Sequence, residues 1–418
     1  MALVTQSTDN RPEAVAFKYG RAWYAGVEAN RWGSALFYSQ VLIDINRAGR
    51  CYQDADPTAE EINSLLDSDG GVIRISDLGK VISLVSLSQV LLVVADNGVW
   101  SIRGGSDGFT PLSYFADRIT NVGCIAKDSV VVVEDTIMYA SQDGIYQISY
   151  AENSKALQAQ SITAPKIDTY YNDITRGEMV NIKGMYDQKE KVVRFFYGVV
   201  ANQPTKCLNI RLKNGAWYPW SFVVNDPDLS AEYFLAFPFY SPRSLVKTGT
   251  KYFVFTVDGS AVERYAIMEH NDVNFVDFGE APIDAHMELV GLTLDNPQFD
   301  KQVAYMTNYF KPTETAITGT DSDGKPVYDF PSSAFLTPKW EWSNTGVGGK
   351  TGRQRQVYNF RNVLADGDGN IEIGSTVVKT RGKLRGEGKA ISLRYDAEAG
   401  KDMKFLGVSM QVNMDGMY

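Results

Sequence analysis

The sequence predicts an all-β protein, and three observations lead to this prediction. Aromatic residues are abundant, with 23 Tyr, 20 Phe and 7 Trp among 418 residues. Val and Ile stand in short runs bounded by Gly, Asn and Asp, a composition that pleated, half-buried strands favour. Asp-Gly and Asn-Gly pairs recur between these runs and supply the positive φ angles of tight hairpin turns. The expected architecture is a β-propeller domain over residues 1–280 and a smaller β-sandwich-like platform domain over residues 281–418.

The strands expected from these runs cover much of the chain. They are Ala14–Ala25, Val72–Ile75, Val81–Leu87, Val90–Val94, Val99–Ile102, Ser129–Val133, Ile137–Ala140, Ile145–Ser149, Val192–Val199, Lys251–Thr256 and Val303–Phe310. One short helix is expected where Thr58 and Glu61 form a capping box ahead of Ile62, Leu65 and Leu66. We expect this helix to be an excursion between strands.

A degenerate repeat organises the first domain. Its copies are Asp96-Asn-Gly-Val-Trp-Ser-Ile102, Asp143-Gly-Ile-Tyr-Gln-Ile148, Lys213-Asn-Gly-Ala-Trp-Tyr218 and Val257-Asp-Gly-Ser-Ala-Val262. In each copy a strand ends in Asp-Gly or Asn-Gly and a new strand follows, and all but the last copy carry an aromatic residue two positions after the glycine. The residues expected to build these blade turns are Gly98, Trp100, Gly144, Tyr146, Gly215, Trp217 and Gly259.

The spacing of this repeat favours a propeller. The gaps between its glycines are 46, 71 and 44 residues, and two of them match a four-stranded blade of about 40–50 residues. The longer gap is expected to hold a blade with a large loop, and Tyr19-Gly-Arg-Ala-Trp-Tyr24 is a candidate for an earlier element. The alternative is another β fold with ordinary hairpins, because Asp-Gly turns are common in all β-proteins.

The pattern changes near residues 275–285, where long loops, a turn at Asp321-Ser-Asp-Gly324 and a basic strand pair begin to dominate. Charge is divided unevenly as well. Between Lys350 and Lys404 there are 12 basic and 7 acidic residues, a net +5, so the rest of the −9 chain carries −14. This asymmetry points to a polar interface or an oriented wall.

The segment of greatest functional interest carries Lys379, Arg381, Lys383 and Arg385 at alternate positions. Because side chains on a strand repeat every two residues, a strand here places all four on one face. Such a stripe is a candidate to contact an acidic neighbouring subunit or to line a channel. The alternative is a solvated edge strand whose charges prevent aggregation.

Several classes of function lack support in the sequence. The apolar runs Val90–Ala95 and Val130–Val133 are far shorter than the roughly 20 residues of a spanning helix. The N-terminal residues do not form a secretory signal, so folding in a cytoplasm is expected. Cys51, Cys124 and Cys207 fit neither a disulfide framework nor a zinc site, and we expect reduced, mostly buried thiols. The net charge of −9 argues against generic nucleic-acid affinity.

Motifs for phosphate and calcium binding are incomplete. Gly346-Val-Gly-Gly-Lys-Thr-Gly352 resembles a phosphate-binding loop but has Asn344 where that motif needs glycine. Asp366-Gly-Asp-Gly-Asn370 departs from an EF-hand loop at Ile371 and Val377. We interpret the first as a glycine-rich loop at a subunit contact and the second as a turn, and expect neither cofactor nor metal.

No motif for acid–base or nucleophilic catalysis stands out. The two histidines, His270 and His286, lie in no recognisable catalytic setting. We therefore expect a protein without enzymatic activity. A polysaccharide-degrading enzyme with a carboxylate pair remains a third alternative, since such pairs meet in space and not in sequence.

The order of several segments resembles the tail nozzle proteins of short-tailed bacteriophages. These segments are Tyr19-Gly-Arg-Ala-Trp-Tyr-Ala-Gly26, Ala35-Leu-Phe-Tyr-Ser39, Asp69-Gly-Gly-Val-Ile-Arg-Ile75, Leu91-Leu-Val-Val-Ala-Asp-Asn-Gly-Val-Trp-Ser-Ile102, Val122-Gly-Cys-Ile-Ala, Ser129-Val-Val-Val-Val133, Tyr139-Ala-Ser-Gln-Asp-Gly-Ile-Tyr146, Arg381-Gly-Lys-Leu-Arg-Gly-Glu-Gly-Lys-Ala-Ile-Ser-Leu-Arg394 and Phe405-Leu-Gly-Val-Ser409. The likeness covers most of the chain and rests on the order of the segments rather than on one sharp motif.

The resemblance implies a virion structural protein, assembled in the host cytoplasm as a homohexameric tube of the tail. The implied partners are further copies of itself, the head-to-tail adaptor ring, tail fibres or other tail appendages, and DNA that passes through the lumen without specific binding. An acidic lumen would repel phosphate and let a duplex slide. The chain is compact for this family, so domains that contact fibres or the host are expected to be reduced or absent. The main alternative is a receptor-binding or carbohydrate-binding β-propeller on a virion or cell surface.

Overall fold

The structure is a computed structural model and consists almost entirely of β-strands. It describes residues 11–27, 32–53, 66–105, 108–151, 156–188, 190–198, 206–221, 232–239, 250–258, 264–271, 276–277, 281–294, 298–314, 317–320, 322, 324, 326–341, 350–358, 364–365, 371–372 and 377–414. The strands account for most of these residues, which confirms the all-β prediction. None of the described helices is long and apolar enough to span a membrane.

The chain divides into two compact units, which are described separately below. The first comprises Met1–Ser221 with Phe234–Pro238, and the second comprises Phe222–Tyr233 with Phe239–Tyr418. The expected domain boundary between residues 280 and 281 stays a prediction.

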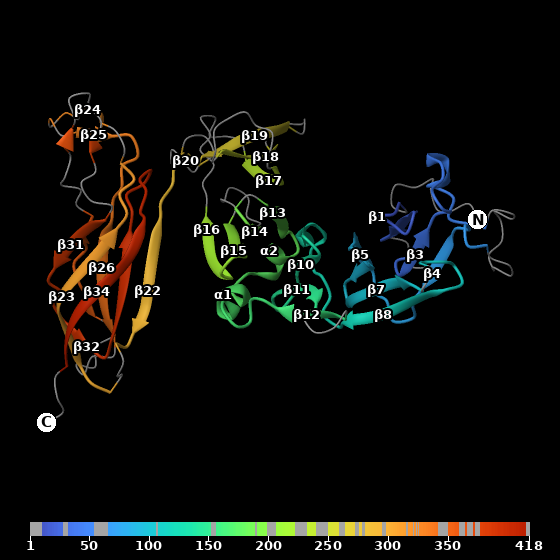
Figure 1. The fold of residues 1–418 in the computed structure, drawn as a ribbon, viewed down its shortest axis with the longest axis horizontal. Helices are drawn as coiled ribbons and strands as arrows, with labels where there is room; N and C mark the ends of the chain where they lie inside the picture. Colours follow the sequence, from blue (N-terminus) through green and yellow to red (C-terminus); the bar gives the residue numbers. More distant parts are fainter. Residues whose placement is uncertain are drawn as a thin grey trace. The chain divides into compact units, whose positions relative to one another are not determined.

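The first unit contains four consecutive antiparallel sheets, each a meander of four strands (Figure 1). The first sheet holds β1 (Ala14–Lys18), β2 (Arg21–Ala25), β3 (Ala35–Tyr38) and β4 (Gly71–Arg74). The second holds β5 (Val81–Ser86), β6 (Leu91–Ala95), β7 (Gly98–Gly104) and β8 (Tyr114–Thr120). The third holds β9 (Val131–Val133), β10 (Thr136–Ala140), β11 (Ile145–Tyr150) and β12 (Leu157–Ser161). The fourth holds β13 (Lys183–Asp187), β14 (Val192–Tyr197), β15 (Lys206–Arg211) and β16 (Ala216–Ser221).

Each of these sheets shares a hydrophobic core with the next. Between the first and second sheets, Phe109 packs edge-on against Trp23 and Tyr38, with ring centroids 4.8 and 5.3 Å away. Between the second and third sheets, alternate residues of β6 such as Leu92 meet Tyr139 of β10. Because side chains on a strand alternate between faces, β6 contributes to both cores and all five of its residues are buried.

The core between the third and fourth sheets includes two short helices, α1 (Asp168–Asn172) and α2 (Arg176–Met179). These helices were not expected from the sequence. Helix α2 begins with a capping box in which Thr175 and Glu178 satisfy each other's backbone amides. The sequence therefore carried a signal for the start of this helix. Helix α2 contributes the buried Met179 to the core.

Most of the expected strands are confirmed, with two corrections. Ala14–Ala25 was expected as one strand but forms the β1–β2 hairpin, because Tyr19 and Gly20 adopt positive φ angles of 55° and 68° at its centre. Ser129–Val133 was expected as a strand from its start, but a 3-10 turn over Lys127–Ser129 precedes β9. The helix expected around Thr58 lies largely outside the described residues.

A fifth sheet follows as a meander of β17 (Glu232–Phe239), β18 (Thr250–Asp258), β19 (Arg264–Asn271), β20 (Val276–Asp277) and β21 (Ala281–Pro282). Two-stranded sheets are formed by β24 (Ile317–Thr320) with β25 (Pro326–Tyr328) and by β29 (Leu364–Ala365) with β30 (Ile371–Glu372). The turn expected at Asp321-Ser-Asp-Gly324 connects β24 and β25, and their antiparallel pairing confirms a hairpin there.

The rest of the second unit is built from two larger sheets. One has the order β22 (His286–Leu292), β33 (Ala390–Asp396), β26 (Phe335–Glu341) and β27 (Lys350–Thr351), with β28 (Arg355–Gln356) also paired to β26. In the other, β23 (Lys301–Phe310) pairs with β31 (Val378–Gly382), β32 (Glu387–Gly388) and β34 (Phe405–Met414).

These two sheets share one hydrophobic core, and each contributes large side chains to it. Phe310 of β23 meets Tyr395 of β33 edge-on, with ring centroids 6.3 Å apart. The Tyr395 hydroxyl donates a hydrogen bond of 2.7 Å to Asn308 Oδ1, so a polar contact also joins the sheets. Trp340 of β26 is almost completely buried in the same core.

Candidate functional sites

The first two blade-turn motifs form hairpins as predicted. Gly98 opens β7 with φ +156°, and a Cβ atom there would lie 2.5 Å from the backbone oxygen of Thr120 on β8, so only glycine fits. Trp100 is buried in the core below the Arg118 guanidinium, which lies 4.8 Å from its ring centroid. Tyr146, two residues after Gly144, stacks on Tyr139 at 6.1 Å.

The third motif has a different place in its sheet. Gly98 is the first residue of the third strand of its sheet and Gly144 directly precedes the third strand of its own, whereas Gly215, with φ +61°, directly precedes the fourth strand, β16. Trp217 of β16 donates a hydrogen bond from Nε1 to the carbonyl of Ile162. The hairpins are thus confirmed, but the repeat is not in register with the sheets. Gly259, the fourth glycine, lies outside the described residues.

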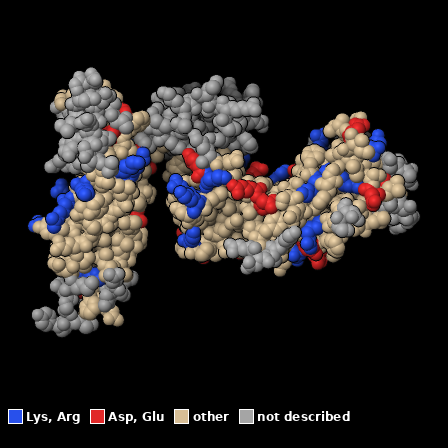
Figure 2. All heavy atoms as spheres, viewed as in Figure 1, with Lys and Arg blue, Asp and Glu red and all other residues tan. Residues whose placement is uncertain are grey.

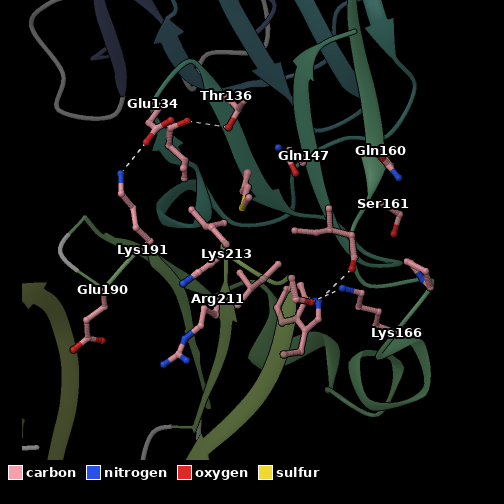
Figure 3. A pocket seen from close by; sticks show the side chains of 18 of the residues that line it. Glu134, Thr136, Gln147, Gln160, Ser161, Lys166, Glu190, Lys191, Arg211 and Lys213 are labelled. Atoms are coloured by element: carbon pink, nitrogen blue, oxygen red, sulfur yellow. Dashed lines mark hydrogen bonds and ion pairs between the residues drawn. The ribbon is translucent and has the colours of Figure 1, made fainter. Parts of the chain in front are cut away.

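Trp217 and Gly215 belong to a cleft of about 940 Å³ between the third and fourth sheets (Figure 3). The wall from the third sheet carries Gln147, Gln160 and Ser161. Gln147 and Gln160 lie directly opposite each other in the β11–β12 register. The floor of the cleft is apolar, with Met138, Ile162, Ile210 and Leu212 among its residues.

The opposite wall of this cleft carries three cations and Glu190. Lys191, Arg211 and Lys213 lie on it, and Lys166 stands at its end (Figure 3). Lys191 Nζ lies 2.9 Å from Glu134 Oε1, and Lys166 Nζ donates a hydrogen bond to the Gly215 carbonyl. Sequence reasoning missed these four cations, because they come from separate segments that only the packing of two sheets brings together.

The basic stripe of the second unit is exposed to solvent, but the single strand expected to carry all four cations is shorter than the stripe. Lys379, Arg381, Lys383 and Arg385 are all solvent-exposed, whereas Val378 before them and Leu384 between the last two are buried. Only the first two lie within β31, which ends at Gly382. Figure 2 shows Lys and Arg gathered at this edge of the unit.

The stripe lies beside an aromatic ring, at the edge of a sheet. Arg381 lies 4.2 Å and Lys383 5.4 Å from the ring centroid of Tyr305 on β23. Among the described strands, β31 pairs with β23 alone, so it lies at the edge of its sheet. Both interpretations of the stripe, an interface and a protected edge strand, agree with this position. Its role therefore stays a prediction.

Two stripe residues also line a second cavity, of about 500 Å³. Lys383 and Arg385 lie there beside Arg353 and Arg355, which sequence reasoning did not single out. A local signal was present, because the two arginines alternate around Gln354 directly after the glycine-rich segment. Two cations of the stripe and two from the segment after β27 thus form a cluster of four at this cavity.

The remaining candidates for chemistry are structural or lie outside the described residues. Cys124 and Cys207 are buried as predicted, and burial raises the pKa of the Cys124 thiol to about 11. His286 is exposed at the start of β22. Among the described residues, no group of three or more His, Cys, Asp or Glu side chains is arranged to hold a metal ion. Residues 346–349 and 366–370 are outside the described part of the chain.

Comparisons with known proteins do not assign a family. No family model matches the chain, and no curated protein matches it. Among solved structures, it is similar to an S. cerevisiae assembly of Dbp5 with Nup159, Gle1, IP6 and ADP, at 12% identity and a TM-score of 0.30 over 71% of this chain and 70% of that one. It is also similar to an engineered GH43 glycoside hydrolase, at 10% identity and a TM-score of 0.26 over 97% of this chain and 98% of that one. At these TM-scores neither likeness carries an argument about fold or function.

Proposed function

We propose that the protein is a non-enzymatic structural subunit of a bacteriophage tail nozzle, a homohexameric tube through which DNA leaves the virion. The main support is the serial packing of the first unit, in which each four-stranded meander shares a core with the next. That is the way blades of a propeller stack. In this proposal the four meanders are consecutive blades, and the two larger sheets of the second unit form a β-sandwich-like platform.

In this proposal, the uneven distribution of charge along the chain drives the contact between subunits. The exposed stripe begins on the edge strand β31 with Lys379 and Arg381, and β31 is backed by a packed core, which fixes the position of these two cations. The rest of the chain is strongly acidic. A ring in which this stripe meets an acidic surface of the next subunit would pair opposite charges at each contact. The remaining acidic surface would keep the lumen from binding the duplex.

Electron microscopy and mass photometry test the assembly directly. We expect sixfold rings or tubes with an open centre, either from the purified chain or after it is mixed with the tail components of its own virion. The Lys379→Glu variant should lower the fraction of rings, because it places an acidic group on the stripe. Lys339→Glu makes the same charge change on the exposed face of the other large sheet and serves as the matched control. Persistent monomers that do not enter tails would contradict the proposal.

The cleft between the third and fourth sheets favours a second candidate, a carbohydrate-binding propeller on a virion or cell surface. Its opposed Gln147 and Gln160 amides and the nearby Trp217 are side chains that recognise sugar hydroxyls and ring faces. A glycan array decides this alternative. Saturable binding that Gln147→Ala and Gln160→Ala both weaken, in a chain that stays monomeric, would replace the nozzle proposal.

A further inference from the structure

The second cavity is bordered by two segments that are both tied to β26. Gly352 N donates a hydrogen bond of 2.7 Å to the Pro338 carbonyl, and Arg355 stands opposite Leu336 in the β26–β28 register. On the other side, the Trp340 indole nitrogen donates a hydrogen bond of 3.2 Å to the Arg385 carbonyl. Because Trp340 is buried, this contact fixes the position of the segment that carries Lys383 and Arg385.

Arg355 is the most constrained of the four cations. Its Nη1 donates a hydrogen bond to the Lys383 carbonyl. Gly382 lies against the same guanidinium, where a Cβ atom would be 3.3 Å from Nη1. The side chain is half-buried, and burial lowers its pKa, although an arginine stays charged in proteins. These contacts place Nη1 of the guanidinium against the segment that carries Lys383.

One edge of this guanidinium has no partner. Nε and Nη2 of Arg355 are both buried and make no hydrogen bond. In a guanidinium these two nitrogens direct their hydrogens the same way and form a fork that matches two oxygens of one carboxylate or phosphate. Among the described arginines, Arg21 and Arg194 each have a single buried nitrogen without a partner, whereas Arg355 has both nitrogens of one edge.

The charge around the cavity is uncompensated by its own walls. Arg353, Arg355, Lys383 and Arg385 contribute four formal positive charges, and no described acidic residue is among the lining residues. Leaving a buried charged donor unsatisfied is costly, and a bound anion removes that cost. Four cations favour a polyvalent anion over a single carboxylate. The volume of about 500 Å³ falls in the range of small-molecule sites, about 300–1,000 Å³.

We propose that this cavity is a phosphate-binding site, in which the Arg355 fork takes two oxygens of one phosphate group and Arg353, Lys383 and Arg385 balance its further charge. The phosphate belongs either to a soluble phosphorylated molecule or to a nucleic-acid backbone. The chemistry at the fork is the same in both cases. All residues of the site lie within the second unit of one chain, so binding can be measured on an isolated subunit.

Isothermal titration calorimetry of the full chain with pyrophosphate, in a phosphate-free buffer, tests the site. We expect saturable binding that Arg355→Met weakens at least roughly tenfold, since two charge-assisted hydrogen bonds are lost. Arg355→Lys keeps the charge but lacks the fork, and should also lose several-fold in affinity. Arg381→Met is the matched control, because Arg381 lies on the same stripe but not among the residues that line the cavity, and should stay within about twofold.

Three results would overturn the proposal. They are an absence of pyrophosphate binding to the wild-type chain, an equal loss in the Arg381→Met and Arg355→Met variants, and binding of acetate as tight as that of pyrophosphate at the same ionic strength. Circular dichroism of Arg355→Lys verifies that its loss of affinity does not reflect unfolding. If Arg355→Met fails to fold, Arg355→Lys and Arg385→Met carry the test.

A competition experiment distinguishes the two sources of phosphate. Pyrophosphate is titrated in the presence of a short DNA duplex at constant ionic strength. If the duplex displaces pyrophosphate from the wild-type chain but not from the Arg355→Lys variant, the site binds a nucleic-acid backbone. Pyrophosphate binding that the duplex leaves unchanged assigns it to a soluble phosphorylated molecule. The ring assay above is independent of both outcomes, so the nozzle proposal and the phosphate site can fail separately.

Discussion

Arg194 is buried and Arg355 is half-buried, yet of these two arginines only Arg194 meets carboxylates. Arg194 is 3% exposed in the first unit, with Nη1 2.9 Å from Asp187 Oδ2 and Nη2 2.6 Å from Glu190 Oε2. Arg355, in the second unit, contacts a backbone carbonyl and leaves one edge of its guanidinium without a partner. A charge that is neutralised within its own unit serves the fold. In the phosphate proposal, a ligand from outside supplies the counter-ion that Arg355 lacks, whereas the buried Arg21 donates to the backbone carbonyls of Ser39 and Asp69.

The pKa directions of the two arginines express the same contrast. Burial lowers the pKa of Arg194, but the carboxylates of Glu190 and Asp187 outweigh burial and leave that pKa raised. Arg355 has burial without a carboxylate, and its pKa is lowered. The charge of Arg194 is therefore stabilised by its surroundings, whereas the charge of Arg355 is not.

The largest effect is expected when Asp187 is removed. Asp187→Ala leaves Arg194 buried beside a single carboxylate, and we expect the free energy of unfolding of the first unit to fall by about 3–5 kcal/mol. Guanidinium denaturation followed by tryptophan fluorescence measures this change. Adding Arg194→Met to the same chain should restore part of the loss, because the uncompensated charge is then gone. A loss below about 1 kcal/mol would mean that the Asp187–Arg194 pair contributes no more than an ordinary surface ion pair. The contrast between Arg194 and Arg355 would then not hold.

The next effect in size tests whether Arg355 binds a phosphate ligand that stabilises the second unit. Pyrophosphate at a hundredfold excess over its dissociation constant should raise the free energy of unfolding of the wild-type second unit by about 2.7 kcal/mol. The Arg355→Met variant should show no such increase at the same concentration. Thermal unfolding with and without pyrophosphate, at matched ionic strength, measures both. Equal stabilisation of the two proteins would indicate a general salt effect.

What could be predicted from sequence was local. The hairpins at Gly98 and Gly144 and the exposure of Lys379 and Arg381 follow from turn chemistry and a period of two, which are contained in a few adjacent residues. The expected strand Ala14–Ala25 ran through the β1–β2 turn, because a tyrosine there takes a positive φ that sequence rules assign to Asn, Asp or Gly. Only the candidate repeat element Tyr19-Gly-Arg-Ala-Trp-Tyr24 pointed to a hairpin at this position.

What could not be predicted depends on register between distant segments. Arg355 acquires its position from pairing with Leu336 and from the carbonyl of Lys383, 28 residues further along the chain. Arg194 lies directly opposite Met185 in the β13–β14 hairpin. Asp187, two residues further along β13, is therefore the diagonal neighbour of Arg194, and a long side chain can reach it. Neither relation has a sequence motif, so both sites needed the three-dimensional structure.

A smaller effect is expected when Arg355 itself is removed. Arg355→Met replaces a partly buried, uncompensated cation by an apolar side chain of similar length, and such replacements are often neutral or stabilising. We expect the free energy of unfolding without ligand to stay unchanged or to rise by up to about 1 kcal/mol. Chemical denaturation in phosphate-free buffer measures it. A clear loss of stability would mean that Arg355 serves the fold, as Arg194 does, and would remove the distinction between them.

The smallest effect is expected at an exposed ion pair. Arg103 and Asp117 pair across β7 and β8 with both side chains 52% exposed. Because water screens such a pair, Asp117→Asn should change the free energy of unfolding of the first unit by less than about 1 kcal/mol, and added salt should reduce the difference further. The same denaturation assay applies as for Asp187→Ala. If both variants lost equal stability, burial would not be what separates the Arg194 network from a surface pair. The absence of a carboxylate beside Arg355 would then say little about a ligand.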